Sequence, residues 1–292
     1  MSSALTLPAT LYPRARRWLR PRSAIPGFGV AFGYTLLYLG LIVLLPLAAL
    51  VLKASEMGVV GWWSAVSDER VVAALKTSFG LSFAAAALDS AFGLLIAWVL
   101  TRYRFPGRKL LDAMLDLPFA LPTAVAGIAL TAIYAPTGWI GQWVEPLGLK
   151  IAFTPVGIFV ALVFVGLPFA VRTVEPLIAD LDRELEEASA TLGATRRQTV
   201  WRVVIPPLIP AIITGFALAF ARAVGEYGSV IFIAGNIPYV SEIAPLLIII
   251  KLEEFNYAGA TAIATVMLAI SFGTLLLINL LQAYSRRKFG HV

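Results

Sequence analysis

Six long apolar runs dominate this sequence and restrict what it can fold into. Each run has about 18 residues or more, the length that a helix needs to cross the hydrocarbon core of a bilayer. They predict membrane-spanning helices at residues 28–52, 71–101, 117–134, 153–174, 207–234 and 258–284. A further apolar stretch, 243–252, is too short to cross and predicts a re-entrant or interfacial helix. Because 59% of the residues are hydrophobic and only 14% are charged, the predicted fold class is an all-α polytopic membrane protein with six transmembrane helices.

The basic residues between the runs indicate how the helices are oriented. Dense clusters of arginine and lysine precede the first run and follow the second and the sixth, whereas the alternate loops hold few basic residues, namely Lys53, Arg70, Lys150 and Lys251. The positive-inside rule places the clusters, and with them both termini, in the cytoplasm. We expect basic cytoplasmic tails at 1–27 and 286–292 and a transmembrane domain at 28–285. These segments account for the net charge of +6, so no nucleic-acid partner is expected.

Several kinds of chemistry are excluded by the residues that the sequence lacks. It contains no cysteine, and its single histidine is His291, next to the last residue. Disulfides, a zinc site and a Cys or His nucleophile are therefore not expected. No Gly-x-x-x-x-Gly-Lys-Ser/Thr phosphate loop occurs, so we expect neither an ATP site nor another cofactor in this chain. A membrane-embedded enzyme is disfavoured on the same grounds, and no metal site is predicted.

One long polar segment, 176–206, interrupts the apolar sequence between the fourth and fifth runs. Within it, one helical stripe is apolar and contains Leu181, Leu185, Ala188 and Leu192. Arg183 and Glu187 are spaced as an i,i+4 ion pair beside this stripe. Gly193 is suited to end the helix in a left-handed conformation, and Pro206 with Pro207 predicts a break before the next run. The segment is therefore predicted to hold a short amphipathic helix outside the lipid.

The spacing in this segment resembles a loop of binding-protein-dependent ABC importer permeases. Their pattern is Glu-Ala-Ala, three residues, Gly, nine residues and Ile-x-Leu-Pro. Here Ser189, Val203 and Ile205 replace the second Ala, the Ile and the Leu. The resemblance implies a type I ABC importer permease fold and a coupling helix seated in a cleft of a separate ATPase. It assigns ATPase coupling to Glu187, Ala188, Ser189, Leu192, Gly193 and Pro206. The simpler alternative is an ordinary cytoplasmic loop helix.

Two further stretches, 117–127 and 222–236, resemble permeases for tetrahedral oxyanions. The similarity is greatest to the T (or U) type subunit of sulfate/thiosulfate importers and covers about residues 25–288. Molybdate permeases share a related Arg-Ala-x-Gly-Glu stretch, so molybdate or another oxyanion stays open. The resemblance implies a bacterial inner membrane location, a heterodimer with a homologous W subunit, two ATPase subunits that carry ATP and Mg²⁺, and a periplasmic sulfate- or thiosulfate-binding protein.

Ionisable residues near the middle of two runs mark the expected interior. In the fifth run, small and polar residues recur at helical spacing: Gly215, Ala219, Arg222, Glu226 and Ser229. In the second run, Ser78, Ser82, Ala85 and Asp89 do the same. A charge at the centre of a membrane helix costs at least about 2.5 kcal/mol, so these residues should face protein or a water-filled path.

The roles of these ionisable residues are left open by the sequence. Arg222 is expected to pair with Glu226 or Asp89, or alternatively to bind an oxyanion. The predicted translocation path or intramembrane pair comprises Asp89, Arg222, Glu226 and Ser229. In an ion-driven secondary transporter, a different class of function, Asp89, Arg222 and Glu226 would instead form a relay.

Overall fold

The computed structural model describes residues 28–289, with side chains through residue 284, and all regular elements in that range are helices. The chain divides into two compact units, 1–49 and 50–292. The first contains α1 (Phe28–Leu39), a π-helical turn (Gly40–Leu44) and the start of α2 (Leu45–Ser55). These three form one continuous apolar helix, which confirms the first predicted span. The tail predicted at 1–27 lies outside the described residues.

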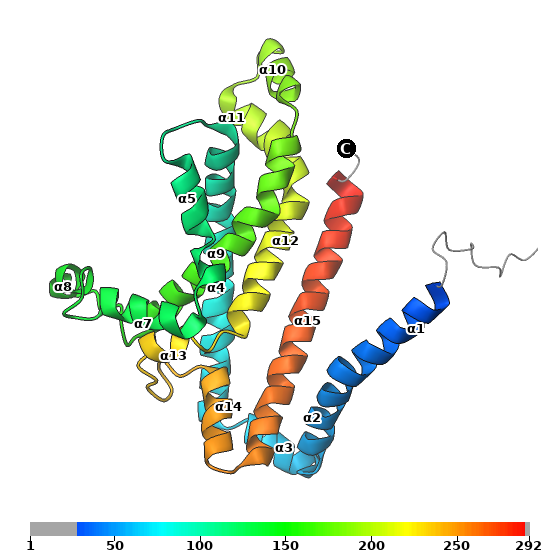
Figure 1. The fold of residues 1–292 in the computed structure, drawn as a ribbon, viewed down its shortest axis with the longest axis vertical. Coiled ribbons are helices and arrows are strands. Elements are labelled where there is room, and N and C mark those ends of the chain that lie inside the picture. Colours follow the sequence, from blue (N-terminus) through cyan, green and yellow to red (C-terminus); the bar gives the residue numbers. More distant parts are fainter. Residues whose placement is uncertain (1–27, 290–292) are drawn as a thin grey trace, which may run out of the picture. The chain divides into compact units, whose positions relative to one another are not determined.

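Three helices form the centre of the second unit: α4 (Glu69–Arg102), α9 (Pro155–Asp180) and α12 (Ile205–Val224). Figure 1 shows them side by side. They approach closely because small residues lie at the crossings. A β-carbon built at Gly93 would lie 2.8 Å from Cβ of Ala170, and one at Gly215 would lie 3.2 Å from Cα of the same residue. Close packing of small residues is a main source of helix association in membranes.

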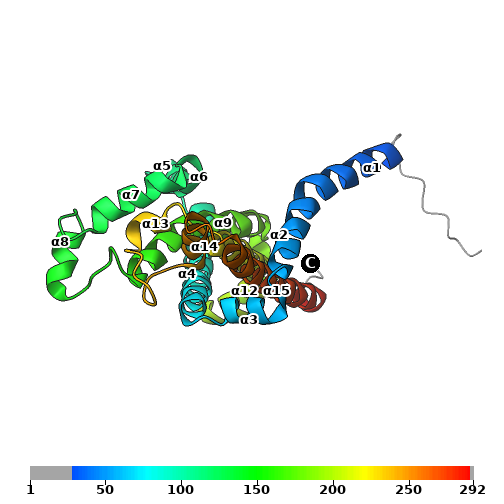
Figure 2. The same cartoon turned by 90° about the horizontal axis from the view of Figure 1, so that it is seen from below.

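The remaining helices lie around this centre. α15 (Tyr257–Phe289) packs against α12 and against the short helix α14 (Ala244–Glu253), which confirms a short helix near 243–252. The shorter elements are α3 (Gly58–Val66), α5 (Arg108–Leu115), α6 (Leu117–Ala120), α7 (Thr123–Tyr134), α8 (Gly141–Val144), a 3-10 turn (Glu145–Leu147), α10 (Arg183–Thr191), α11 (Arg196–Thr199), a second π-helical turn (Val200–Val204) and α13 (Val230–Ile233). Seen from below, α7 and α8 extend to one side of the α4–α9–α12 group (Figure 2).

Five helical segments in the described range are long and apolar enough to cross a membrane: Phe28–Ser55, Glu69–Arg102, Pro155–Asp180, Arg196–Val224 and Tyr257–Tyr284. The prediction of one continuous third helix over 117–134 is wrong. This run is divided into α6 and α7 at Leu121 and Pro122. The cause is Pro122, which disfavours a helical conformation at the preceding residue and leaves Leu121 extended, with φ −84° and ψ 134°.

The fifth predicted helix, 207–234, is also different in the structure. It begins earlier, because α11, the second π-helical turn and α12 join into one helical segment, Arg196–Val224. The predicted break at Pro206 and Pro207 is therefore wrong. Both prolines directly follow the π-helical turn, in which the N–H of Ile205 donates to the carbonyl of Val200 and the α-helical hydrogen-bond pattern is already interrupted, so the helix continues through them.

This helix also ends earlier than predicted, at Val224. The carboxylate of Glu226 accepts a hydrogen bond from the backbone N–H of Ser229 (2.9 Å), and such a local bond competes with helix formation. Glu226 and Ser229 consequently lie in a turn and not on the predicted helical stripe.

Candidate functional site

α10 is a nine-residue helix with a defined cap at each end. The side chain of Asp182 accepts a hydrogen bond from the N–H of Glu184 (2.9 Å) at its start. At its end, Gly193 has φ +82°, its N–H donates to the carbonyl of Ala190 (3.0 Å), and the N–H of Ala194 donates to that of Ser189 (3.1 Å). This is a Schellman motif, which needs a left-handed residue at Gly193. The predicted role of Gly193 in ending the helix is confirmed.

The apolar stripe of α10 is largely uncovered. Leu192 is 87% exposed and Leu185 is 45% exposed. Ala188 and Glu187 are exposed as well. Only Leu181, just before the helix, packs against the core that α4, α9 and α12 form. Exposed apolar side chains grouped in this way mark protein–protein or membrane interaction sites.

Polar contacts fix α10 to the helices beside it. Ser189 and Thr199 are both buried, and their hydroxyl oxygens are 2.8 Å apart. This bond joins α10 to α11, the first turn of the segment that continues into α12. Ser189 stands where the loop pattern of the importer permeases has an alanine. Its hydroxyl makes a structural contact with Thr199, a partner that the spacing of the sequence does not indicate. The bond therefore connects α10 to the helical segment Arg196–Val224, which includes α12.

The ion pair expected between Arg183 and Glu187 is a wrong prediction. Among the described residues, the carboxylate that forms ion pairs on α10 is Glu186, which contacts Arg196 (3.0 Å) and Arg102 at the end of α4 (3.4 Å). Arg102 also donates a hydrogen bond to the carbonyl of Leu181 (2.9 Å). Glu186 is the more buried of the two glutamates and reaches Arg102 of α4, whereas the side chain of Glu187 is exposed.

The intramembrane pair is formed by Arg222 and Glu226, one of the two predicted alternatives. Glu226 also accepts hydrogen bonds from the backbone N–H and the hydroxyl of Ser229, each at 2.9 Å. Glu226 and Ser229 are buried, whereas the side chain of Arg222 is 32% exposed. The turn after α12 therefore holds the carboxylate of Glu226 in place. This carboxylate in turn positions the guanidinium of Arg222, which stays partly exposed.

Asp89 does not take part in this cluster. Its side chain lies where α4 meets α9 and α12, is 1% exposed, and has no hydrogen-bond partner among the described residues for either oxygen. The alternative pair of Arg222 with Asp89 is therefore not formed, and neither is a hydrogen-bonded relay through the three residues. Asp89 instead packs against Gly166 of α9.

Gly166→Ala is expected to lower the stability of the folded protein because the added methyl would overlap with Oδ2 of Asp89. Overpacking of this kind costs about 1–3 kcal/mol. Thermal unfolding of the purified protein in detergent should show a lower midpoint, and most of that loss should vanish in an Asp89→Ala background. Gly80→Ala makes the same substitution on α4, the helix that carries Asp89, at a position with open space around it, and is the matched control. An equal loss in both backgrounds would contradict the packing of Asp89 against Gly166.

Two ion-pair groups were not singled out from the sequence. Arg172 on α9 contacts Asp112 of α5 and Asp116 at the junction of α5 and α6, each at 2.8 Å, and Glu175 of its own helix at 2.7 Å. On the other side of the unit, Arg70 donates to both carboxylate oxygens of Glu242, at 2.7 and 2.6 Å. For the group around Arg172, the sequence signal was this arginine itself, because it is a charged residue inside the fourth apolar run.

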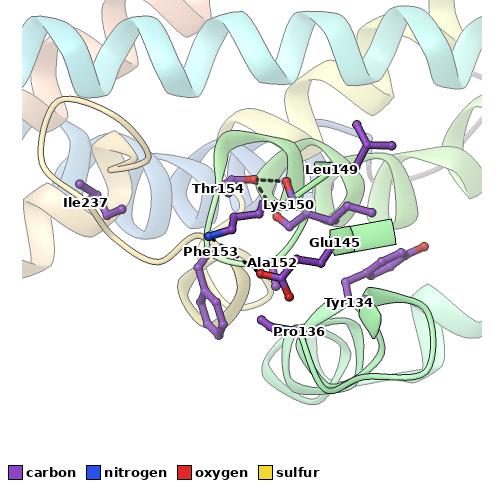
Figure 3. A pocket seen from close by; sticks show the side chains of 11 residues that line it. Tyr134, Pro136, Glu145, Leu149, Lys150, Ala152, Phe153, Thr154 and Ile237 are labelled. Atoms are coloured by element: carbon purple, nitrogen blue, oxygen red, sulfur yellow. Dashed lines mark hydrogen bonds and ion pairs between the residues drawn. The ribbon is translucent and has the colours of Figure 1, made fainter. Parts of the chain in front are cut away.

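A cavity of about 310 Å³ lies between α7 and the start of α9, remote from α10. Figure 3 shows Glu145 and Lys150 at its wall, where their charged atoms are 3.9 Å apart. The hydroxyl of Thr154 accepts a hydrogen bond from the backbone N–H of Val156 (3.2 Å) and so caps the start of α9, and it also donates to the carbonyl of Ile151 (2.7 Å). Across the described residues, no group of His, Cys, Asp and Glu is arranged to hold a metal ion.

Comparisons with known proteins relate the chain to membrane transport proteins. The family described as binding-protein-dependent transport system inner membrane component matches residues 89–291. A sulfate transport system permease protein of Escherichia coli K12 is 49% identical over 271 residues, which cover 92% of this chain and 98% of the relative. The corresponding permease of Synechococcus elongatus is 52% identical over 257 residues, covering 88% and 92%. A solved bacterial alginate ABC transporter contains a chain of similar fold, with a TM-score of 0.72 at 17% identity over 89% of this chain and 94% of that one.

Proposed function

The chain belongs to the family of binding-protein-dependent transport system inner membrane components, and on this premise we propose that it is the permease subunit of an ATP-driven importer for sulfate or thiosulfate. The observation that carries the substrate class is the identity of about one half, over nearly the whole of both chains, to sulfate permeases. We place the protein in the bacterial inner membrane with both termini in the cytoplasm, in accord with its basic clusters.

An importer of this kind needs further subunits, and these are the partners that we propose for this chain. ATP and Mg²⁺ would be held by two copies of an ATPase subunit, because this sequence has no phosphate loop. A homologous permease of the W type would form the second half of the pathway, and a periplasmic protein would deliver the anion. The exposed stripe of Leu185, Ala188 and Leu192 supports an ATPase partner, since docking would cover it.

Coupling would proceed through α10. Closure of the ATPase dimer on ATP would move α10 as a rigid element, because caps hold both of its ends. The contact between Ser189 and Thr199 passes this movement to α11. The helical segment Arg196–Val224 then carries it to Arg222, near the far end of the same segment. Hydrolysis would reverse the displacement and restore the inward-facing state.

Arg222 would line the pathway with its side chain held by Glu226, and it would not bind the transported anion tightly. Glu226 neutralises it directly, and a carboxylate at that place would compete with an anionic substrate. We therefore assign the Arg222–Glu226–Ser229 cluster to shaping the turn after α12. Selectivity among oxyanions would come mainly from the binding protein.

Uptake of labelled sulfate tests this proposal. In cells that lack their own sulfate permease, this chain expressed with its W-type, ATPase and binding-protein partners should restore uptake, and unlabelled thiosulfate should compete. Restored uptake of labelled molybdate with no restoration of sulfate uptake would contradict the assignment to sulfate. Uptake that persists without the ATPase subunit would instead support an ion-driven secondary transporter.

A further inference from the structure

Two cavities meet at the end of α4 that carries Arg102, beside α10. One has a volume of about 390 Å³ and is bordered by charged and aromatic residues, and the other, of about 240 Å³, is bordered almost wholly by apolar residues. Trp98 and Arg196 line both of them. The two spaces therefore adjoin, with a polar part beside α10 and an apolar part that runs along α4.

The polar cavity has an excess of positive charge. Its ionisable lining consists of three arginines and two glutamates, which gives one net positive charge: Arg102, Arg183, Arg196, Glu186 and Glu187. Glu186 is shared between Arg102 and Arg196. Within the described range, Arg183 is in no ion pair, so its donors are free to bind an anion. The guanidinium of Arg102 also lies 5.3 Å from the ring centre of Trp98, which keeps the aromatic wall in place.

The apolar cavity lies on a surface suited to lipid. It is bordered by α4 and by the helical segment that begins at Arg196, through Ala91, Leu94, Leu95, Val200, Val204 and Leu208. Large apolar side chains of the same two helical segments are exposed, namely Leu95 of its lining and the sequence neighbours Phe92 and Trp201. Tyr103 and Trp98 line the polar cavity next to it. Aromatic and arginine residues at one level of a membrane helix mark the boundary between acyl chains and headgroups.

We propose that the joined cavities bind one anionic glycerophospholipid of the cytoplasmic leaflet. Its phosphate would lie against Arg183 and Arg196, and one acyl chain would occupy the space between Ala91 and Leu208. A free oxyanion would satisfy the arginines but leave the apolar part empty. The site rests on the orientation proposed above but not on the transported substrate.

Such a lipid would join the membrane to the coupling element. Arg183 is the first residue of α10, and Leu94 and Leu95 belong to α4. A bound phospholipid would therefore contact both at once and restrain α10 relative to the bilayer. The expected consequence is an anionic lipid that stays with the protein through purification and is lost when either part of the cavity is changed.

Lipid retention tests the site without a transport measurement. The full chain, with the subunits that co-purify with it, is placed in phosphatidylcholine nanodiscs with or without phosphatidylglycerol. It is then transferred to detergent and examined by native mass spectrometry. We expect one retained phosphatidylglycerol. Arg183→Gln should lower its retention about fivefold, as for loss of one basic residue near an anionic surface. Ala91→Trp should abolish retention by filling the apolar cavity.

Two control variants keep the result specific. Arg202→Gln removes an exposed arginine outside both cavities, and Ala84→Trp adds the same ring to α4 seven residues before Ala91 on the same side of the helix. Both should retain lipid as the unchanged protein does. Equal retention in all variants, or equal retention of phosphatidylcholine, would overturn the proposal. Displacement of the lipid by inorganic sulfate would also overturn it, since that would identify a free-oxyanion site.

Discussion

Leu192→Asp is expected to abolish ATP-driven uptake while the chain still folds and inserts into the membrane. The side chain is 87% exposed, so it contributes little to the stability of this chain alone. In a docked complex it would lie at the interface, beside the Schellman motif that ends α10. Truncating or charging a central apolar residue of an interface costs at least about 2 kcal/mol, which corresponds to about a 30-fold loss of affinity. Uptake and co-purification of the ATPase should both be lost.

The control for this substitution is Leu192→Met, which keeps an apolar side chain of similar size and should retain uptake. The amount of protein in the membrane, measured by immunoblot, should be the same for both variants. Full uptake by Leu192→Asp would show that the exposed stripe of α10 is not used for coupling. A chain that fails to accumulate would instead show that Leu192 stabilises the fold.

The second large effect is expected at the intramembrane ion pair, and it should be asymmetric. Arg222→Met leaves the carboxylate of Glu226, whose side chain is 2% exposed, without its counter-ion. Breaking a buried pair in this way costs about 3–5 kcal/mol. Glu226→Gln should cost less, because Arg222 is partly exposed and the glutamine oxygen still accepts from Ser229.

Thermal unfolding in detergent measures this asymmetry. The double variant, with Arg222→Met and Glu226→Gln together, should be more stable than Arg222→Met alone, since it carries no uncompensated charge. If Glu226→Gln proved the more damaging single change, or if the two effects added independently, the pair would not be the element that holds the turn after α12.

Those parts of the fold that depend on local sequence could be predicted. α4, α9 and α15 lie within or around uninterrupted apolar runs, so hydropathy alone locates them. The breaks near Pro122 and Gly225 could not be located in the same way, because apolar residues continue on both sides of each. Hydropathy does not detect the local conformational restriction by Pro122 or the hydrogen bond that Glu226 makes to Ser229.

Those features of the candidate site that depend on the spacing of residues along the chain could be predicted. Those that depend on contacts between residues far apart in the sequence were missed. Gly193 could be assigned because a helix end needs a left-handed residue at a fixed position. The choice of Glu186 over Glu187 depends on Arg102, a residue of another helix. Arg70 and Glu242 are separated by 172 positions, so no local pattern relates them. Such pairs depend on how the helices pack, which periodicity does not specify.

Cross-linking at α10 tests the central claim, that this helix is held by a separate ATPase. The sequence contains no cysteine, so Leu192→Cys and Trp139→Cys each introduce a single thiol, the second at an exposed residue remote from α10. In membranes that also contain the ATPase with one cysteine in its docking cleft, a short bifunctional maleimide should join it to Cys at position 192 and not to Cys at position 139. Cross-linking at neither position, or at position 139 alone, would contradict the claim.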